Sequence, residues 1–280
     1  MPLLALGGCY PGVLNPAGPV AAGNRTILLN SLSIMLMIVV PTIVATLAFA
    51  WWFRAGNSRA RYRPTWSYSG RLELLVWSVP LLIVIFLAGI AWIGSHDLDP
   101  RRPIASRQRP LVVEVVALDW KWLFIYPEQG VASVNRLVMP AGGPIRFRIT
   151  SGTVMNSFFV PRLGSQIYAM PGMETTLFLQ ADQPGQYRGI SAQYSGPGFA
   201  DMRFVADSVT PTQFAAWAAR ARAGSGPVLD GPGFLTLAKR SAASPVVTYR
   251  AVQPRLFEAI LLHSGAPVRE TQSGGREDRR

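Results

Sequence analysis

The sequence has few of the residues that form disulfides or bind soft metals. Its 280 residues include one cysteine, Cys9, and two histidines, His96 and His263. A single cysteine excludes disulfide bonds within the chain and any cluster of thiolate ligands. Charged residues are scarce too, at 15% against about 25% in typical soluble proteins. Residues 26–53 and 74–95 contain none at all, which excludes a purely soluble protein.

Both uncharged segments are long enough to cross a membrane. About 20 apolar residues in a helix span a hydrocarbon core of about 30 Å, and Ile27–Phe53 and Leu74–Ile93 meet that length. Pro41 and Pro80 lie inside them, where membrane helices tolerate proline. Tryptophans favour the membrane interface, and four lie toward the segment ends: Trp51, Trp52, Trp77 and Trp92. Only these two segments qualify, so a transporter with many spans is excluded.

The segment that connects the two spans is basic. It carries a single acidic residue, Glu73. Its arginines are Arg54, Arg59, Arg61, Arg63 and Arg71. The positive-inside rule places such a segment in the cytoplasm and both ends of the chain outside. Arginines after the second span oppose this orientation, but the first helix usually dominates and long domains translocate largely regardless of charge. The prediction is a helical hairpin that carries an exported domain.

The net charge of +12 raises the question of nucleic-acid binding, because basic proteins attract polyanions. The arginines of residues 1–109 lie mostly beside the apolar segments, however, and residues 110–280 contain no block of Lys or Arg. Membrane flanks and a mildly basic exported domain explain the charge. We therefore predict no nucleic-acid partner.

Cys9 follows Leu6-Gly7-Gly8, an arrangement that resembles a bacterial lipobox. In a lipobox the cysteine is lipidated and becomes the first residue of the mature protein. Eight residues without a basic region do not make a complete signal peptide, so we expect the natural start upstream of Met1. The alternative is a chance cysteine in a segment of small residues.

From residue 110 onward, short runs of β-forming residues are separated by Gly/Pro turns. Residues 145–149 alternate strictly between apolar and charged side chains, as in a half-buried strand. Several short strands within about 100 residues indicate a β-sandwich or barrel. Helices are expected at Gln213–Ala223 and Pro254–His263, and a disordered tail at Ser273–Arg280. The expected strands are Leu111–Leu118, Trp122–Tyr126, Ser133–Val138, Ile145–Thr150, Ser157–Val160, Thr175–Gln180, Gln186–Ile190 and Met202–Ala206.

Three blocks of sequence resemble one family. They are residues 119–130 (DWKWLFIYPEQG), 154–170 (VMNSFFVPRLGSQIYAM) and 195–202 (SGPGFADM). They resemble subunit II of the cytochrome bo-type ubiquinol oxidases, the quinol branch of the haem-copper terminal oxidases, and the similarity extends from about residue 9 to about residue 264. The resemblance implies a membrane-anchored all-β protein, in which a two-helix transmembrane hairpin precedes a periplasmic cupredoxin-like β-sandwich and a short helical C-terminal extension.

The resemblance also implies a layout and a location. We expect a two-pass protein of the bacterial inner membrane, with both termini and the β domain on the periplasmic side. The expected segments are a leader with the lipobox at 1–25, a transmembrane helix at 26–53, a cytoplasmic loop at 54–73, a second transmembrane helix at 74–95, a linker at 96–109, the cupredoxin-like domain at 110–207, the helical extension at 208–264 and a disordered tail at 265–280.

The two-copper centre that cytochrome c oxidases hold in this domain lacks its ligands here. The family pattern is C-x-E-x-C-x3-H-x2-M with a second histidine upstream. On this sequence, its two cysteines fall on Ser191 and Ser195, its glutamate on Gln193, its histidines on Phe199 and Asn156, and its methionine on Met202. A hydroxyl cannot replace a bridging thiolate, and methionines such as Met155, Met170 and Met173 make a poor copper(II) site without Cys or His. We predict that this chain binds no metal.

A missing copper relay implies a donor that does not need one. Cytochrome c delivers electrons from outside the membrane, whereas ubiquinol is dissolved in the bilayer and can reduce subunit I from within. The resemblance therefore implies subunit II of a proton-translocating quinol oxidase of the aerobic respiratory chain, non-catalytic and without a cofactor. The haems and copper, and the contact with ubiquinol, are expected in partner subunit I. Other small membrane subunits and membrane lipid are further expected partners.

Two tryptophans and one glutamate each have two possible roles. Trp120 and Trp122 match the aromatic patch that accepts electrons from cytochrome c in the family. Without a copper centre there is no acceptor to which they could pass electrons, so a packing role is favoured. Glu73 opens the second span, where the family places a glutamate at the mouth of the proton pathway. Ionisable groups at membrane edges often mark proton routes. A carboxylate that merely complements the helix dipole is the alternative.

Two other functions compete with the quinol oxidase subunit. One is a cytochrome c oxidase subunit II with a copper relay, which the missing ligands disfavour. The other is a membrane-tethered module that binds a periplasmic ligand, and co-purification with a large haem protein would separate it from an oxidase subunit.

Overall fold

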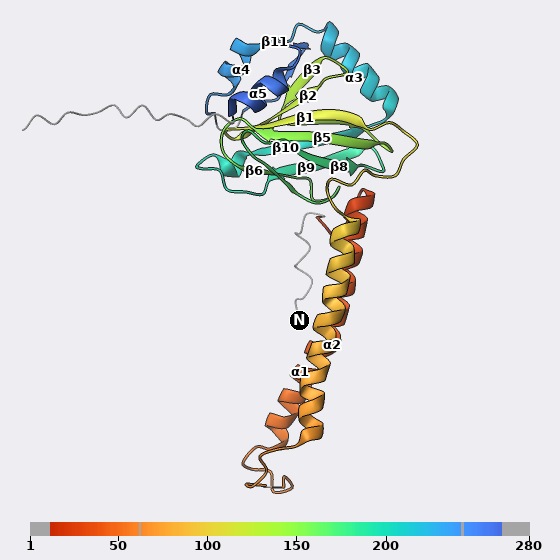
Figure 1. Ribbon diagram of the computed structural model, residues 1–280, viewed down its shortest axis with the longest axis vertical. Coiled ribbons are helices and arrows are strands. Elements are labelled where there is room, and N and C mark those ends of the chain that lie inside the picture. Colours follow the sequence, from red (N-terminus) through yellow and green to blue (C-terminus); the bar gives the residue numbers. More distant parts are fainter. Residues whose placement is uncertain (1–11, 62, 242–243, 265–280) are drawn as a thin grey trace, which may run out of the picture. The chain divides into compact units, whose positions relative to one another are not determined.

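The computed structural model describes residues 12–61, 63–241 and 244–264. The chain divides into two compact units. One is Ala22–Asp99, and the other combines Met1–Ala21 with Pro100–Arg280. The first unit is a pair of apolar helices and the second is rich in β-strands (Figure 1).

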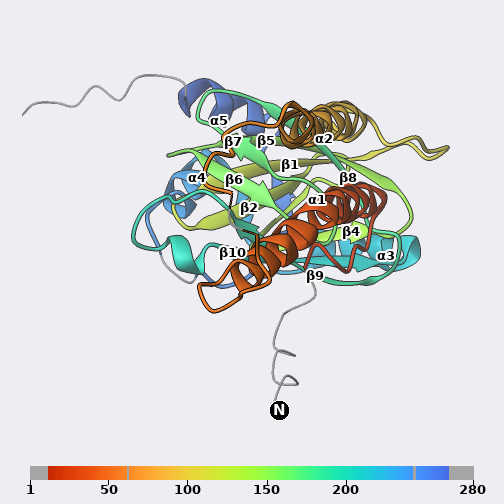
Figure 2. The ribbon, with the colours of Figure 1, turned by 90° about the horizontal axis from the view of Figure 1, so that it is seen from below.

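The helix pair consists of α1 (Pro19–Trp52) and α2 (Gly70–Asp97), both long and apolar enough to cross a membrane. They pack closely at Gly94, where an added Cβ would lie 2.4 Å from Ile27 Cδ1. Figure 2 shows the helices close together at this end and further apart where the connecting segment joins them. Most of their large apolar side chains are exposed. Such surfaces require lipid or other membrane helices around them.

Both helices begin before the predicted spans. α1 starts with proline, whose fixed φ suits the first helical position, and it continues through the polar residues 24–26 that precede the apolar segment. α2 gains Gly70–Glu73 at its start, after Ser69. The apolar segments therefore predict the membrane-spanning parts, whereas the helices extend beyond them.

The second unit is built on two packed sheets. The six-stranded sheet has the order β12-β3-β2-β1-β5-β8, and the five-stranded sheet has the order β4-β10-β9-β6-β7. A short pair, β11-β13, completes the strands described. Their bounds are β1 Leu111–Leu118, β2 Lys121–Tyr126, β3 Val131–Val134, β4 Arg136–Pro140, β5 Pro144–Ser151, β6 Asn156–Phe159, β7 Ile167–Ala169, β8 Thr175–Gln180, β9 Gly185–Ser191, β10 Arg203–Val209, β11 Val228–Leu229, β12 Val247–Tyr249 and β13 Ala251–Val252.

An aromatic core fills the space between the two sheets. Trp122 and Phe124 project from β2 toward Phe158 of β6 and Phe204 of β10, with ring centroids 5.2–6.4 Å apart. These rings meet mostly edge to face or tilted, which aromatic pairs prefer. In β5 the apolar Ile145, Phe147 and Ile149 are fully buried while the arginines between them are not, so the predicted alternation is confirmed.

One predicted strand is wrong. The run Ser133–Val138 was expected to form a single strand, but Asn135 has a φ of 57°, in the left-handed region that asparagine tolerates. The chain turns there, so that β3 belongs to the six-stranded sheet and β4 to the five-stranded sheet. The three-residue strand β7 was not predicted.

Part of the C-terminal extension forms a third layer, whereas its first helix contributes Phe214 to the core between the two sheets. The extension contains α3 (Pro211–Ala223), α4 (Gly231–Leu237) and α5 (Leu256–Ser264). Figure 1 shows α4 and α5 over the side of the six-stranded sheet that faces away from the other sheet. A second apolar core fills this interface, formed by Val116, Leu118, Leu123, Ile125, Ala132, Val134, Leu229, Tyr249, Leu256, Phe257 and Ile260. Both faces of β1 and β2 are therefore buried.

Candidate functional site

The structure brings the predicted ligand positions together at one end of the five-stranded sheet. Asn156 opens β6 and Ser191 closes β9, and these strands pair antiparallel. The loop after β9 carries Gln193 and Ser195, and a 3₁₀ turn, η1 (Phe199–Asp201), leads to Met202. The paired strands β6 and β9 and the loop that joins β9 to β10 thus supply all six side chains.

Ser191 and Asn156 bind each other. Ser191 Oγ lies 3.2 Å from Asn156 Oδ1 and 3.2 Å from the carbonyl oxygen of Gln193, so its hydroxyl has two acceptors in reach. Asn156 Nδ2 donates to the carbonyl of Val154 at 3.0 Å. Both side chains are buried. Buried polar groups need such partners, and here the hydroxyl and the amide satisfy each other.

Ser195 and Met202 form a second contact in the same loop. Ser195 Oγ donates to Met202 Sδ at 3.8 Å, and Met202 belongs to the core between the sheets. Phe199 is partly exposed and its ring meets Tyr194 edge to face, with centroids 5.7 Å apart. Met202 is therefore a core residue, and the position that holds a histidine in the family pattern carries an aromatic contact.

Trp120 shapes this loop. It has a φ of 64° at the turn between β1 and β2, and its Nε1 donates to the carbonyl of Ser195 at 3.1 Å. Its ring lies against Gly198, where an added Cβ would lie 2.2 Å from Trp120 Cδ2. Gly196 adopts a φ of 109°, which L side chains rarely adopt. Both glycines are therefore needed for the loop to fold over the indole, while Trp122 is fully buried in the core.

The donor set does not fit a two-copper centre. The side chains that meet here offer hydroxyls, an amide and one thioether, and they are already paired with one another or with backbone carbonyls. Copper sites of this kind require thiolate and imidazole ligands. His96 and His263 lie in α2 and α5, outside the sandwich. Within the described residues no three His, Cys, Asp or Glu side chains group closely enough to hold a metal.

The β unit also contains a cluster of charged residues that was not predicted from the sequence. Arg148 of β5 contacts three carboxylates, at 2.7 Å from Glu114 of β1, 2.8 Å from Glu174 and 3.2 Å from Glu258 of α5. Its guanidinium also lies over the ring of Phe257, 4.8 Å from the centroid. One cation thus joins the six-stranded sheet to the C-terminal extension.

The three carboxylates do not share this cation equally. Burial raises the pKa of Glu114 from 4.5 to about 7, although Arg148 opposes the shift. Glu174 behaves in the opposite way, because its hydrogen bonds from Arg148 lower its pKa. Hydrogen bonds to Glu174 and Glu258 hold the pKa of Arg148 above its usual range. Glu114 is therefore the member of the cluster that retains a proton near neutral pH.

Two other predicted functional residues, Glu73 and Cys9, lie outside this site. Glu73 lies in the first turn of α2, exposed, and its backbone N–H donates to the carbonyl of Ser69 at 3.0 Å. No basic side chain of the described residues forms an ion pair with its carboxylate. Cys9 lies outside the described residues. The structure therefore tests neither the proton-entry role nor the lipidation.

Two protein-family models match the β unit. Residues 128–209 match the family described as "Cytochrome C oxidase subunit II, periplasmic domain", and residues 224–263 match the "COX Aromatic Rich Motif". The crystal structure of the periplasmic domain of cytochrome oxidase subunit II from Bradyrhizobium japonicum aligns with 41% of this chain and 95% of its own, at 24% identity and a TM-score of 0.39.

Comparison with known sequences identifies the branch. The ubiquinol oxidase subunit 2 of Acetobacter aceti is 49% identical over 92% of this chain and 84% of its own length. The cytochrome bo(3) ubiquinol oxidase subunit 2 of Pseudomonas aeruginosa is 47% identical over 93% of this chain and 78% of its own. The chain belongs to the ubiquinol oxidase subunit 2 family. The resemblance noted in the sequence is confirmed, and the protein is membrane-anchored with a periplasmic β domain.

Proposed function

We propose that this chain serves a quinol oxidase as a subunit without a catalytic centre or cofactor of its own. The observation that carries the proposal is the pairing of Ser191 with Asn156 and of Ser195 with Met202 where copper ligands would otherwise stand. These side chains satisfy one another, so the loop needs no metal to complete its polar contacts. The electrons of ubiquinol would then enter subunit I without passing through this domain.

The partner subunit I would hold the haems and the copper at which oxygen is reduced. The exposed apolar faces of α1 and α2 support a membrane location beside such a polytopic partner. The arginine-rich segment between the helices supports an orientation with that segment in the cytoplasm and both termini outside, in the bacterial inner membrane. Its β unit would pack over subunit I and shield it.

Glu73 is the second element of the proposal. Its carboxylate is exposed at the start of α2 and has no ionic partner among the described residues. It is therefore free to take up protons for the pathway in subunit I. Cys9 is proposed to carry lipid in the mature protein.

The experiment that tests the main proposal measures metal and donor together. The oxidase is purified through a tag on this chain, and its copper content and its oxidation of ubiquinol-1 and reduced cytochrome c are determined. The proposal expects ubiquinol oxidation, negligible cytochrome c oxidation and no copper in this chain after it is separated from subunit I. Two coppers in the separated chain would refute it.

A further inference from the structure

The two-residue turn between β1 and β2 holds a tryptophan where glycine is usual. Leu118 of β1 pairs with Lys121 of β2, so Asp119 and Trp120 alone form the turn. Turns this short normally place glycine or asparagine where φ is positive, but here the residue with a φ of 64° is Trp120. A bulky side chain is strained in this conformation, and it persists there only where neighbouring contacts hold it. Contacts on either side of the turn must therefore offset this strain.

The C-terminal extension supplies contacts on both sides of this tryptophan. The carboxylate of Asp119 accepts a hydrogen bond from Nε of Arg240 at 3.0 Å. Lys121 is only 2% exposed, and its Nζ donates to the carbonyl of Lys239 at 2.8 Å and to Oγ of Ser241. The three contacting residues of the extension follow one another in the sequence, and we call them the strap. The strap thus holds both neighbours of the tryptophan.

Polar contacts, rather than close packing, fasten the strap to the six-stranded sheet. A pocket of about 220 Å³ opens between the two, because Lys121 and Val134 of the sheet line it together with the strap. The side chains of Lys239 and Arg240 are themselves exposed. Segments with few buried apolar contacts open at the lowest cost in free energy. Loss of the contacts with the turn would therefore release the strap.

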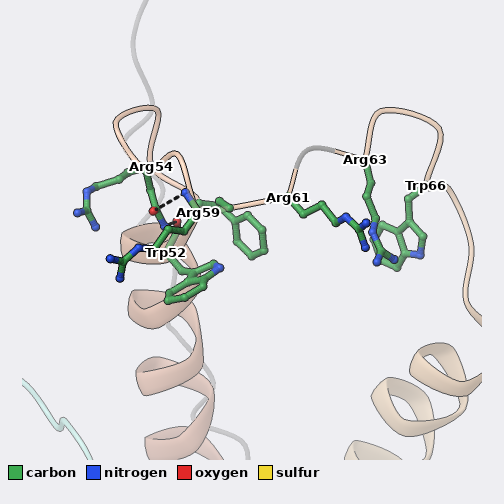
Figure 3. Close-up of a pocket in the computed structure, with 9 residues that line it drawn as sticks. Trp52, Arg54, Arg59, Arg61, Arg63 and Trp66 are labelled. Atoms are coloured by element: carbon green, nitrogen blue, oxygen red, sulfur yellow. Dashed lines mark hydrogen bonds between the residues drawn. The ribbon is translucent and has the colours of Figure 1, made fainter.

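The arginines between α1 and α2 do not converge on a common partner in this way. Four of them line one pocket, but Figure 3 shows Arg59 directed away from Arg61 and Arg63. Basic residues are usual beside membrane helices. The described residues of that segment therefore form a basic flank rather than a ligand site.

On its other side, Trp120 supports the loop that joins β9 to β10. Its Nε1 donates to the carbonyl of Ser195 at 3.1 Å, and its ring fills the space beside Gly198. The same loop carries Tyr194, which is 70% exposed. The conformation of the loop therefore determines the surface at this end of the sandwich.

We propose that the strap sets the conformation of this loop through Trp120. While the strap holds Asp119 and Lys121, the backbone of Trp120 keeps its positive φ and the indole stays against the loop. When the strap is released, the turn relaxes, the indole leaves Ser195 and Gly198, and the loop loses its support. A change in the extension thereby reaches the surface that the loop presents. This coupling concerns the β unit alone and does not depend on the proposed function.

Hydrogen exchange of the full chain in detergent tests the coupling. The backbone N–H of Phe199 donates to the carbonyl of Gly196 at 3.0 Å and that of Met202 to the carbonyl of Phe199 at 3.1 Å, so these two amides report opening of the loop. The variant Lys121→Met/Arg240→Gln removes both fastenings of the strap and leaves the tryptophan in place. It should raise the exchange rates of the two amides at least about tenfold, because hydrogen bonds from charged groups are worth that factor or more.

The matched control, Lys239→Met/Arg250→Gln, makes the same two kinds of substitution in the extension. Lys239 contacts Lys121 through its backbone carbonyl, which the substitution keeps. Arg250 is exposed and forms no ion pair with a described residue. The loop amides of this control should exchange as they do in the wild type.

A second comparison shows whether the effect passes through the indole. Trp120→Gly removes the ring and relieves the strain, because glycine adopts a positive φ freely. This variant should itself raise the exchange rates of the loop amides. Addition of Lys121→Met/Arg240→Gln to it should then change these rates by less than about twofold, because the element that couples the two sites is gone.

Several results would overturn the proposal. One is unchanged exchange in Lys121→Met/Arg240→Gln, and another is the same increase in the control. An equally large increase on addition of these changes to Trp120→Gly would mean that the strap acts by another route. If Lys121→Met does not fold, Arg240→Gln alone is compared with Arg250→Gln. Loss of the one partly exposed ion pair should then raise loop exchange about two- to fivefold, and equal rates in these two variants would contradict the proposal.

Discussion

Replacement of Arg148 by methionine should loosen the C-terminal extension from the sandwich. Arg148 joins Glu114 of β1 and Glu174, beside β8, to Glu258 of α5. Methionine keeps much of the apolar stem but removes the one cation, so three carboxylates are left facing one another. Without that cation, the most buried of them must take up a proton or find water.

The expected loss of stability depends on pH. Removal of one partner from a fully buried pair costs about 3–5 kcal/mol, but the Arg148 side chain is 22% exposed, so we expect about 2–3 kcal/mol at pH 8. At pH 5 Glu114, whose pKa is about 7, is already protonated in the wild type. Only the contacts with Glu174 and Glu258 are then lost, and partly exposed pairs contribute about 0–1 kcal/mol each. The variant should therefore be closer to wild type at pH 5.

The wild type should show a matching pH dependence. The raised pKa of Glu114 means that the folded chain binds this proton more tightly than the unfolded chain does. Its contribution to stability is complete below about pH 4.5 and is lost as the pH rises through about 7. Glu174, whose pKa is lowered, contributes in the opposite direction, and its share is lost as the solution becomes more acidic than pH 4.5. Between pH 5 and 8 the cluster should lose at most about 3 kcal/mol, and Glu114→Gln should abolish this loss.

The assay is urea unfolding of the full chain in detergent, followed by tryptophan fluorescence at pH 5 and pH 8. Hydrogen exchange of the amides in α5 reports whether the extension detaches first. Arg146→Met is the matched control, because Arg146 lies on the same strand two residues away, is exposed and forms no ion pair with a described residue. It should change stability by less than about 0.5 kcal/mol. An Arg148→Met effect equal to this control at both pH values would refute the reasoning.

Other predictions concern the loop, the N-terminus and the second span. Gly198→Ala should destabilise the chain by about 1–3 kcal/mol in the same assay, since its methyl group would enter the ring of Trp120; an unchanged midpoint would mean that the loop can yield. A quadruple variant restores the four missing ligands by the changes Asn156→His, Ser191→Cys, Ser195→Cys and Phe199→His. If the loop keeps its geometry, this variant should show purple two-copper absorption, and a colourless protein after copper loading would contradict this. Intact-mass analysis should find a lipidated Cys9 at the mature N-terminus, and an unmodified chain that starts at Met1 would exclude it. Glu73→Ala should slow quinol oxidation with haem content unchanged and Glu73→Asp should slow it less, whereas equal rates would leave only the helix dipole, worth about 0.3–1 kcal/mol.

Local patterns in the sequence predict what depends on neighbours along the chain. β1 and β8 begin and end where the runs of β-forming residues do. The ligand positions follow from the family pattern, and the structure places Asn156 beside Ser191 although they are 35 residues apart in the sequence. The turn at Asn135 was not predicted, because a single residue with positive φ redirects the chain inside a run of β-forming residues. Such a turn is a weak signal when no glycine or proline marks it.

The Arg148 cluster could not be predicted, because it depends on pairing between distant strands. Alternation along β5 places Arg146 and Arg148 on the face opposite Phe147, but that alone gives a solvated surface. The parallel register of β1 with β5 sets Glu114 opposite Arg148, and α5 then covers both. Neither the register nor the covering helix has a local signature in the sequence.

The β unit gains most of its stability away from the loop that carries the ligand positions. The six-stranded sheet supplies it, because apolar side chains cover both of its faces. Each strand of the central pair, β1 and β2, contributes apolar side chains to both cores, and burial of these side chains stabilises both interfaces. The residues at four of the ligand positions, Asn156, Ser191, Ser195 and Phe199, belong to neither apolar core. The fold therefore does not depend on copper ligands at these positions.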